Sequence, residues 1–253
     1  MTVSEKAWSH FLALLRDIDD RAVAEMLDYI TRHPNWNTEL GLKTTIEVAF
    51  GLATKYGEAS AAVACEMYDA IAAASGAAVP AAIPAETASY GEVAKTVYGT
   101  VDIGSEKIVA EGVGRLVKMA GADTTLKNAI RDQAEFAWIP AGDTCAFCLT
   151  LASNDWQPAS KKALKGGHAE HIHANCDCTY AVRFDRKSQV AGYEPKKYLD
   201  MSRDADGRSP KAKINAMRRE FYAENRERIN EQKRSAYAKR RERESSAAEE
   251  KDV

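Results

Sequence analysis

Apolar residues recur at three- and four-residue spacing along the first part of the chain, the pattern of helices that bury one face. The first such stretch covers residues 4–32, with Ser4 placed to cap it and Pro34 placed to end it. Asn37 and Thr38 offer a second cap, from which a helix is predicted to residue 55.

Gly57 interrupts the apolar pattern, so an alanine-rich third helix is predicted separately, over residues 58–75. Gly76 is placed to accept the left-handed backbone of its C-cap. The stretch that follows, AAVPAAIPA, holds two prolines and no charge. It predicts a linker or a surface crossing.

Helical and then strand-like patterns follow the linker. Strands are favoured by alternation of apolar and polar residues and by β-branched and aromatic side chains. Helices are favoured by apolar residues at three- to four-residue spacing. The predicted elements are helices over residues 92–97, 105–119 and 123–135, the last with an Asp-Thr-Thr cap, a short helix over 146–153, and strands over 136–139 and 179–184.

These elements predict an α+β protein that is mostly helical. The predicted division is a helical N-terminal region (1–76), an Ala/Pro linker (77–90), a small α+β module with a Cys/His metal site (91–185), a connector (186–210) and a protruding, net basic helix (211–248). The length of 253 residues and the 45% hydrophobic content allow such a core. No run of about 18 apolar residues and no secretion signal are found, so we expect no membrane insertion and a reducing compartment.

Charge is segregated toward one end, although the formal net charge is only −2. Residues 211–244, here called the arm, hold twelve Lys and Arg against six Asp and Glu. Such a block is typical of contact with a polyanion such as double-stranded DNA, or with an acidic protein surface. The alternative is a solvated helix in which Glu and Arg pair with each other.

Four of the five cysteines and three of the five histidines lie between residues 145 and 178. Cys145 and Cys148 form a Cys-x-x-Cys pair, and a second set of donors follows about two dozen residues later: His173, Cys176 and Cys178. Two separated pairs of soft ligands are typical of structural zinc, which is tetrahedral. We therefore predict one Zn²⁺ bound by Cys145, Cys148 and two of the other three, clamping the ends of the two strands. His168 and His171 are assigned to the surface or to supporting contacts.

Other interpretations of these residues are open. The cysteines could form two disulfides or stay unmetallated. A catalytic zinc would need an open position and a general base such as Glu170 or Asp143, but thiolate-rich ligation leaves a poor Lewis acid. A His-Asn-His-type nuclease needs a further metal ligand on a following helix, and no histidine follows His173. We expect no enzymatic activity.

The run from Trp138 through Asp143, Cys145 and Cys148, followed by the His-x-x-Cys-x-Cys set that ends at Cys178, resembles the Mu F-like minor head proteins of tailed phages. The resemblance covers residues 110–184. Asp177 stands where that family usually has arginine.

This resemblance implies a virion protein that acts in head morphogenesis near the portal, inside the phage head, and is assembled in the bacterial host cytoplasm. Its implied partners are the portal or the capsid and scaffold proteins, and packaged DNA could contact the arm. The alternative is a zinc-containing nucleic-acid-binding protein or His-Asn-His-like nuclease.

Overall fold

The computed structural model describes residues 4–101, 105–140, 146–160, 178–190 and 193–204, together with helical positions scattered between 212 and 234. It contains two compact units. The first consists of residues 1–139 and 156–193, and the second of residues 140–155 and 194–253. The described part is mostly helical with one small antiparallel sheet, in agreement with the predicted class.

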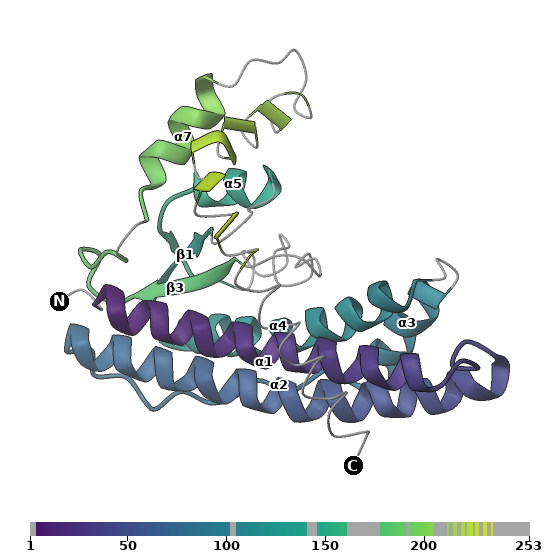
Figure 1. Ribbon diagram of the computed structural model, residues 1–253. Helices are drawn as coiled ribbons and strands as arrows, with labels where there is room; N and C mark the ends of the chain where they lie inside the picture. The colour runs from purple at the N-terminus through teal and green to yellow at the C-terminus, as the bar shows by residue number, and fades with distance from the viewer. Residues whose placement is uncertain are drawn as a thin grey trace. The chain divides into compact units, whose positions relative to one another are not determined.

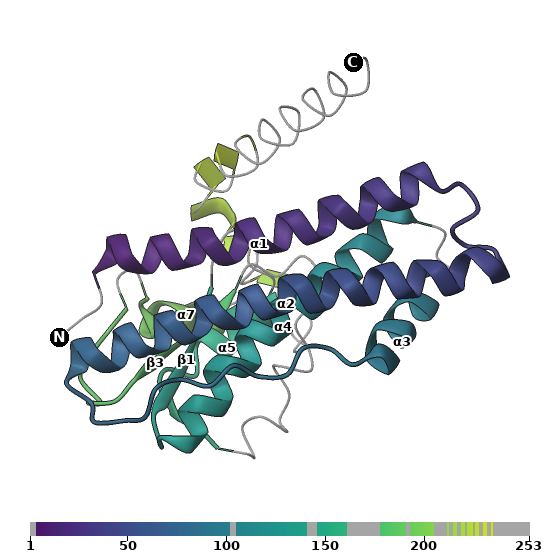
Figure 2. The ribbon, with the colours of Figure 1, turned by 90° about the horizontal axis from the view of Figure 1, so that it is seen from below.

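Long helices form the body of the first unit. They are α1 (Glu5–Arg32), α2 (Glu39–Ser75), α3 (Tyr90–Val101) and α4 (Glu106–Arg131). Helices α1, α2 and α4 lie side by side along much of their length (Figures 1 and 2). None of the helices in the described ranges is long and apolar enough to span a membrane.

The caps predicted for the first two helices are confirmed. The Ser4 hydroxyl accepts a hydrogen bond from the backbone N–H of Ala7 at 3.2 Å, and Thr38 accepts one from Gly41 at 3.2 Å. Gly76 ends α2 with a φ of 69°, the left-handed conformation that glycine adopts without a Cβ penalty.

The break predicted at Gly57 is wrong, because α2 continues from Glu39 to Ser75 without interruption. Gly57 is buried, and a Cβ at this position would lie 2.9 Å from Cγ2 of Thr87. The glycine therefore allows a close approach by another segment, and the surrounding alanines keep the helix intact.

The break predicted before Asp123 is also wrong, because α4 runs through it and ends at Arg131. Thr124 and Thr125 do not cap a new helix. Their hydroxyls donate to the carbonyl oxygens of Ala120 and Gly121, at 2.7 and 3.2 Å, inside the same helix. The helix predicted to reach residue 135 gives way to a strand.

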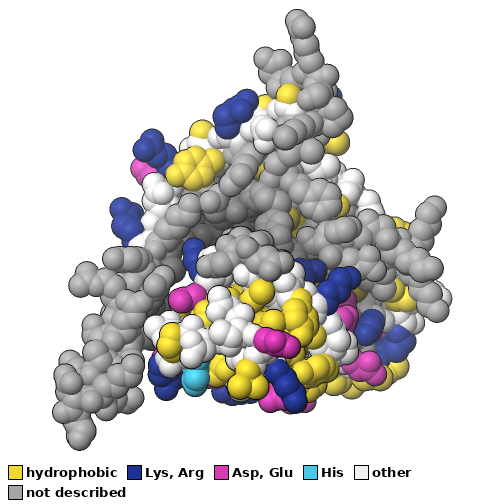
Figure 3. All heavy atoms as spheres, turned by 90° about the vertical axis from the view of Figure 1, so that its right-hand side faces the viewer, with side chains coloured by type: hydrophobic (Ala, Val, Ile, Leu, Met, Phe, Trp, Pro, Cys, Tyr) yellow, Lys and Arg dark blue, Asp and Glu magenta, His cyan; other side chains and the backbone are white. Residues whose placement is uncertain are grey.

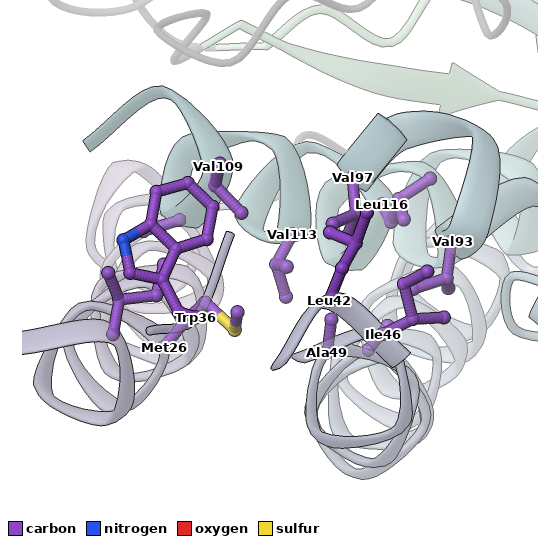
Figure 4. Close-up of a cluster of buried hydrophobic side chains, with 13 residues drawn as sticks. Met26, Trp36, Leu42, Ile46, Ala49, Val93, Val97, Val109, Val113 and Leu116 are labelled. Atoms are coloured by element: carbon purple, nitrogen blue, oxygen red, sulfur yellow. The ribbon is translucent and has the colours of Figure 1, made fainter. Parts of the chain in front are cut away.

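The main core fills the space between the four helices. Trp36, from the turn between α1 and α2, lies near Met26 and Val109 in Figure 4. The cluster consists of Met26, Ile30, Trp36, Leu42, Ile46, Ala49, Ala53, Val93, Val97, Val109, Ala110, Val113 and Leu116. Helices on both sides of the predicted linker thus share one core, while the predicted domain boundaries themselves stay a prediction.

Residues 77–89, here called the strap, form the extended connection between α2 and α3 and run along α2 (Figure 2). Side chains of the helices bind its backbone. The Asn128 amide accepts from Ile83 N–H at 2.9 Å and donates to Ile83 C=O at 2.8 Å. Asp69 accepts from Ala82 N–H at 2.8 Å. The strap is therefore a surface crossing with fixed backbone partners.

The sheet of the first unit has the strand order β2-β1-β3. Strand β1 is Glu135–Ile139, β2 is Gln157–Pro158 and β3 is Thr179–Arg183. The two predicted strands are thereby confirmed as antiparallel neighbours, whereas β2 was not predicted. The sheet packs on α4 and α2, where Phe184 meets the ring of Tyr68 edge-on at 5.4 Å.

The second unit contains α5 (Ala146–Ala152) and α7 (Pro195–Asp204), which contact each other. The short helix predicted at 146–153 is confirmed. The described positions of the arm between residues 212 and 234 are helical, as predicted. Lys197 of α7 forms an ion pair with Glu224 of the arm at 2.7 Å.

Candidate functional site

The predicted metal ligands are only partly within the described residues. Cys145, His173 and Cys176 lie outside them, as do His168 and His171. Cys148 is fully buried in α5, and Cys178 is partly exposed immediately before β3. Within the described ranges, no three His, Cys, Asp or Glu side chains gather where they could hold a metal ion. The zinc site therefore stays a prediction.

Strand pairing fixes where the two cysteine-bearing segments join the sheet. Ile139, the last residue of β1, is paired with Thr179, the first residue of β3. The segment that follows β1 and the segment that precedes β3 are therefore attached at the same end of the sheet. Both segments carry sulfur or imidazole donors in the sequence, and such donors are suited to zinc.

The opposite end of the sheet is fixed by an arginine. Arg183 donates to Glu135 at 2.6 Å, and its guanidinium lies 4.6 Å from the centre of the Trp156 ring. Both charged side chains are mostly buried. Their pairing opposite each other in the β1–β3 register stabilises the alignment of the strands.

A turn after β3 is held by Asp185. Its carboxylate accepts from the backbone N–H groups of Ser188 at 2.7 Å and Lys187 at 3.0 Å, and from the Ser188 hydroxyl at 2.8 Å. These bonds favour the charged form and lower the pKa of Asp185 to about 2. The carboxylate is thus a structural anion at neutral pH.

A pocket opens in the first unit between α1, α2, α4 and the ends of β1 and β3. Leu12, Leu15 and Trp138 supply much of its apolar lining. Ser60 and Gly121 meet at its floor, where a Cβ on Gly121 would lie 2.6 Å from the Ser60 hydroxyl oxygen. Because Gly121 has no Cβ, α2 and α4 can approach each other closely with the Ser60 side chain between them.

Three charged residues also line this pocket: Arg16 and Asp19 from α1, and Lys118 from α4. Lys118 and Asp19 form an ion pair at 3.1 Å, and their side chains are 19% and 12% exposed. The sequence pattern does not indicate this pocket. Its lining comes from five separate segments of the chain. Within any one of these described segments, the only unusual feature is that the leucines near the start of α1 are weakly buried.

The arm presents arginines at described positions of its helix. Arg219, Arg226 and Arg234 are all exposed. The described positions of the arm also include four exposed glutamates, so the net positive charge of the arm is a feature of its full sequence. On the face of the molecule in Figure 3, the coloured Lys and Arg side chains are likewise interspersed with Asp and Glu.

Comparison with known proteins identifies the family. A model of the VG15 protein family matches residues 2–205, which include the four helices, the sheet and every predicted metal ligand. The chain belongs to the VG15 protein family. This is a family of viral and phage proteins. No curated protein and no solved structure matches the chain.

The VG15 match supports the general resemblance to phage proteins. The narrower assignment to Mu F-like head proteins stays a prediction. The match ends at residue 205 and so does not include the arm. Any activity of the arm must therefore be tested separately from that of residues 2–205.

Proposed function

We propose that this VG15 family member is a phage minor head protein that acts in head morphogenesis near the portal. Its place is the interior of the phage head, and its partners are the portal or the capsid and scaffold proteins. The observation that carries the proposal is the match to a viral and phage family over residues 2–205. The cysteine and histidine pattern at 145–178 supports the narrower assignment to a head protein.

The direct test is quantitative mass spectrometry of virions purified from the phage that encodes the chain. The proposal expects peptides of this protein in heads before and after tail attachment, at a few copies per portal. An in-frame deletion of the gene should reduce the yield of filled heads. Complete absence of the protein from purified heads, together with an unchanged yield, would contradict the proposal.

The zinc in this proposal is structural, and the protein is not an enzyme. Cys145 and Cys148 supply two ligands, and two of His173, Cys176 and Cys178 supply the others. A bound Zn²⁺ would link the segments that leave β1 and enter β3, both of which are attached at one end of the sheet. Because thiolates neutralise the ion, such a site stabilises the fold rather than activates water.

Elemental analysis of freshly purified, reduced protein tests the metal. We expect about one zinc per chain, a strong loss in Cys145→Ser and Cys148→Ser, and lower thermal stability of both variants. Cys65→Ser is the matched control, because Cys65 lies in α2 outside the predicted ligand set and should keep the full zinc content. Zinc-free wild-type protein, or cysteine variants that melt like the wild type, would refute the site.

The arm is the part of this protein that we assign to DNA. Its excess of six positive charges and its exposed arginines suit sequence-independent contact with phosphates of packaged DNA. The same charge favours the alternative function, a zinc-containing nucleic-acid-binding protein or His-Asn-His-like nuclease. Cleavage of DNA by the purified protein in the presence of a divalent metal would support that alternative.

A further inference from the structure

The pocket of the first unit combines an apolar wall with a positive charge, and its lining residues belong to that unit. Leu12 and Leu15 of α1 are only partly buried, although they belong to the apolar face of the helix. Farther along the same face, Ala22, Met26 and Ile30 are completely buried in the core. The apolar face of α1 is therefore covered by the core toward its C-terminal end and borders the pocket toward its N-terminal end.

The charges around the pocket do not cancel. Asp19 is paired with Lys118, so this pair contributes no net charge. Arg16 is half-buried at the pocket wall, and within the described residues no carboxylate forms an ion pair with it. Among the described residues of its lining, the pocket thus has one positive charge in excess, beside leucine and tryptophan side chains.

Hydroxyl groups add polar contacts at the same place. Ser60 is only 3% exposed and still lines the pocket, and Thr179, the first residue of β3, also lines it. Pockets that are mainly apolar, with a few placed polar groups, are the usual form of small-ligand sites. Guanidinium groups bind carboxylates with paired hydrogen bonds.

We propose that this pocket binds a monoanionic carboxylate with a short apolar body, with the carboxylate at Arg16 and the apolar part against Leu12, Leu15 and Trp138. The same chemistry is found in a free small carboxylic acid and in the C-terminal residue of a protein chain. In either case one negative charge matches the excess positive charge of the described lining residues. This inference does not depend on the head-protein assignment. Cys178, a candidate zinc ligand, also lines the pocket.

NMR titration of the full-length protein tests this proposal, with the indole N–H signals of the four tryptophans as the readout. The probes are 4-phenylbutanoate, N-acetyl-phenylalanine with a free carboxylate, and their two neutral amides. The Trp138 signal, assigned with Trp138→Phe, should shift saturably with the acids, and the amides should bind at least about tenfold more weakly. The acid that binds more tightly identifies the source: the free acid or the chain terminus.

Arg16→Gln should weaken binding of the acids about tenfold and leave the weak binding of the amides unchanged. Arg21→Gln is the matched control, since Arg21 is an exposed α1 arginine that pairs with Asp17 and does not line the pocket. Neither change affects the buried core, so both variants should fold. Equal binding of acids and amides, an unchanged affinity in Arg16→Gln, or shifts spread over all four indoles would each overturn the proposal.

Discussion

The side chain of Asn128 binds the backbone of the strap in the way that a neighbouring strand would. Its side-chain amide offers one donor and one acceptor in the arrangement of a backbone peptide group, and Ile83 uses both. Asn128 is 2% exposed, and its amide nitrogen also donates to Thr124 C=O at 2.7 Å. A single side chain thus satisfies both backbone groups of a residue in an extended segment.

Asn128→Ala should therefore destabilise the first unit by about 2 kcal/mol, because both polar groups of Ile83 lose their partner in a partly buried position. The free energy of unfolding in urea measures this change. Asn128→Asp keeps the acceptor but loses the donor, and its loss should be no smaller, because it also places a carboxylate beside Ile83 C=O.

Lys127→Ala, at the exposed neighbouring position of α4, should change the free energy of unfolding by less than about 0.5 kcal/mol. Equal stability of Asn128→Ala and Lys127→Ala would mean that the strap is not held by these bonds.

Residue-scale features were predictable where their partners are close in sequence. The caps at Ser4 and Thr38 involve residues three positions away, so the local pattern contains the whole interaction. The Asn128 pair joins residues 45 positions apart, and nothing near either residue indicates the other.

At the scale of elements, α2 passes the strap so closely that one of its helical positions requires glycine. A Cβ on Gly57 would meet Cγ2 of Thr87 at 2.9 Å. Alanine is otherwise favoured over glycine in a helix by about 1 kcal/mol. The steric clash and the helix propensity of alanine therefore oppose each other. The clash is with Thr87, a β-branched residue of the strap.

We expect Gly57→Ala to destabilise the protein by about 1 kcal/mol despite its better helix propensity. Adding Thr87→Ser removes the clashing methyl group, so the double variant should recover that loss. Thermal or urea unfolding of the four proteins in this cycle gives the coupling between the two positions.

Gly51→Ala is the control in the same helix, since no atom lies within 4 Å of the Cβ that it introduces. This variant should be stabilised by about 0.5–1 kcal/mol. If Gly57→Ala is stabilised to the same extent, the strap does not restrict α2.

Most helices and strands could be predicted from the sequence, but several of the positions at which helices begin or end could not. The apolar period located the helices, and the β-branched and aromatic runs located β1 and β3. Gly57 and the Asp-Thr-Thr run at 123–125 indicated helix ends, yet tertiary packing keeps both helices continuous there. A capping box was overlooked: Ser89 and Glu92 exchange hydrogen bonds at the start of α3.

For the whole molecule, the candidate metal site and the pocket differ in how far sequence can reveal them. The predicted zinc ligands Cys145 and Cys148 are separated by only two residues, so local spacing indicates them. The pocket collects side chains from α1, α2, α4 and two strands, and its charge balance depends on the Asp19–Lys118 pair across two helices. Such a site becomes visible only with the fold.

Deletion of residues 211–253 should abolish binding of double-stranded DNA and leave the zinc content unchanged. For the intact protein, log affinity should fall with log salt concentration by about 0.9 for each phosphate neutralised. Changing Arg219, Arg226 and Arg234 together to glutamine should reduce this slope by about 2–3. Fluorescence anisotropy of a labelled duplex at several salt concentrations measures both effects.

The control is the triple change of Glu220, Glu227 and Glu231 to glutamine, at exposed described positions of the same helix. It should strengthen binding, because it removes negative charge without altering the arginines. Undiminished affinity after the deletion would assign DNA binding to another part of the chain. Absence of salt-dependent binding in the intact protein would make the arm a solvated or protein-docking helix.

The strap also bears on what a cut in the chain would do. Its backbone is held by side chains of α2 and α4, and the core beneath joins α1 and α2 to α3 and α4. A protease nick between residues 77 and 89 would therefore break the covalent chain without separating the two pieces, whereas either piece produced alone would expose half of a core. For the integrity of this protein, the core that the helices share across the strap matters more than the peptide bonds that the strap contains.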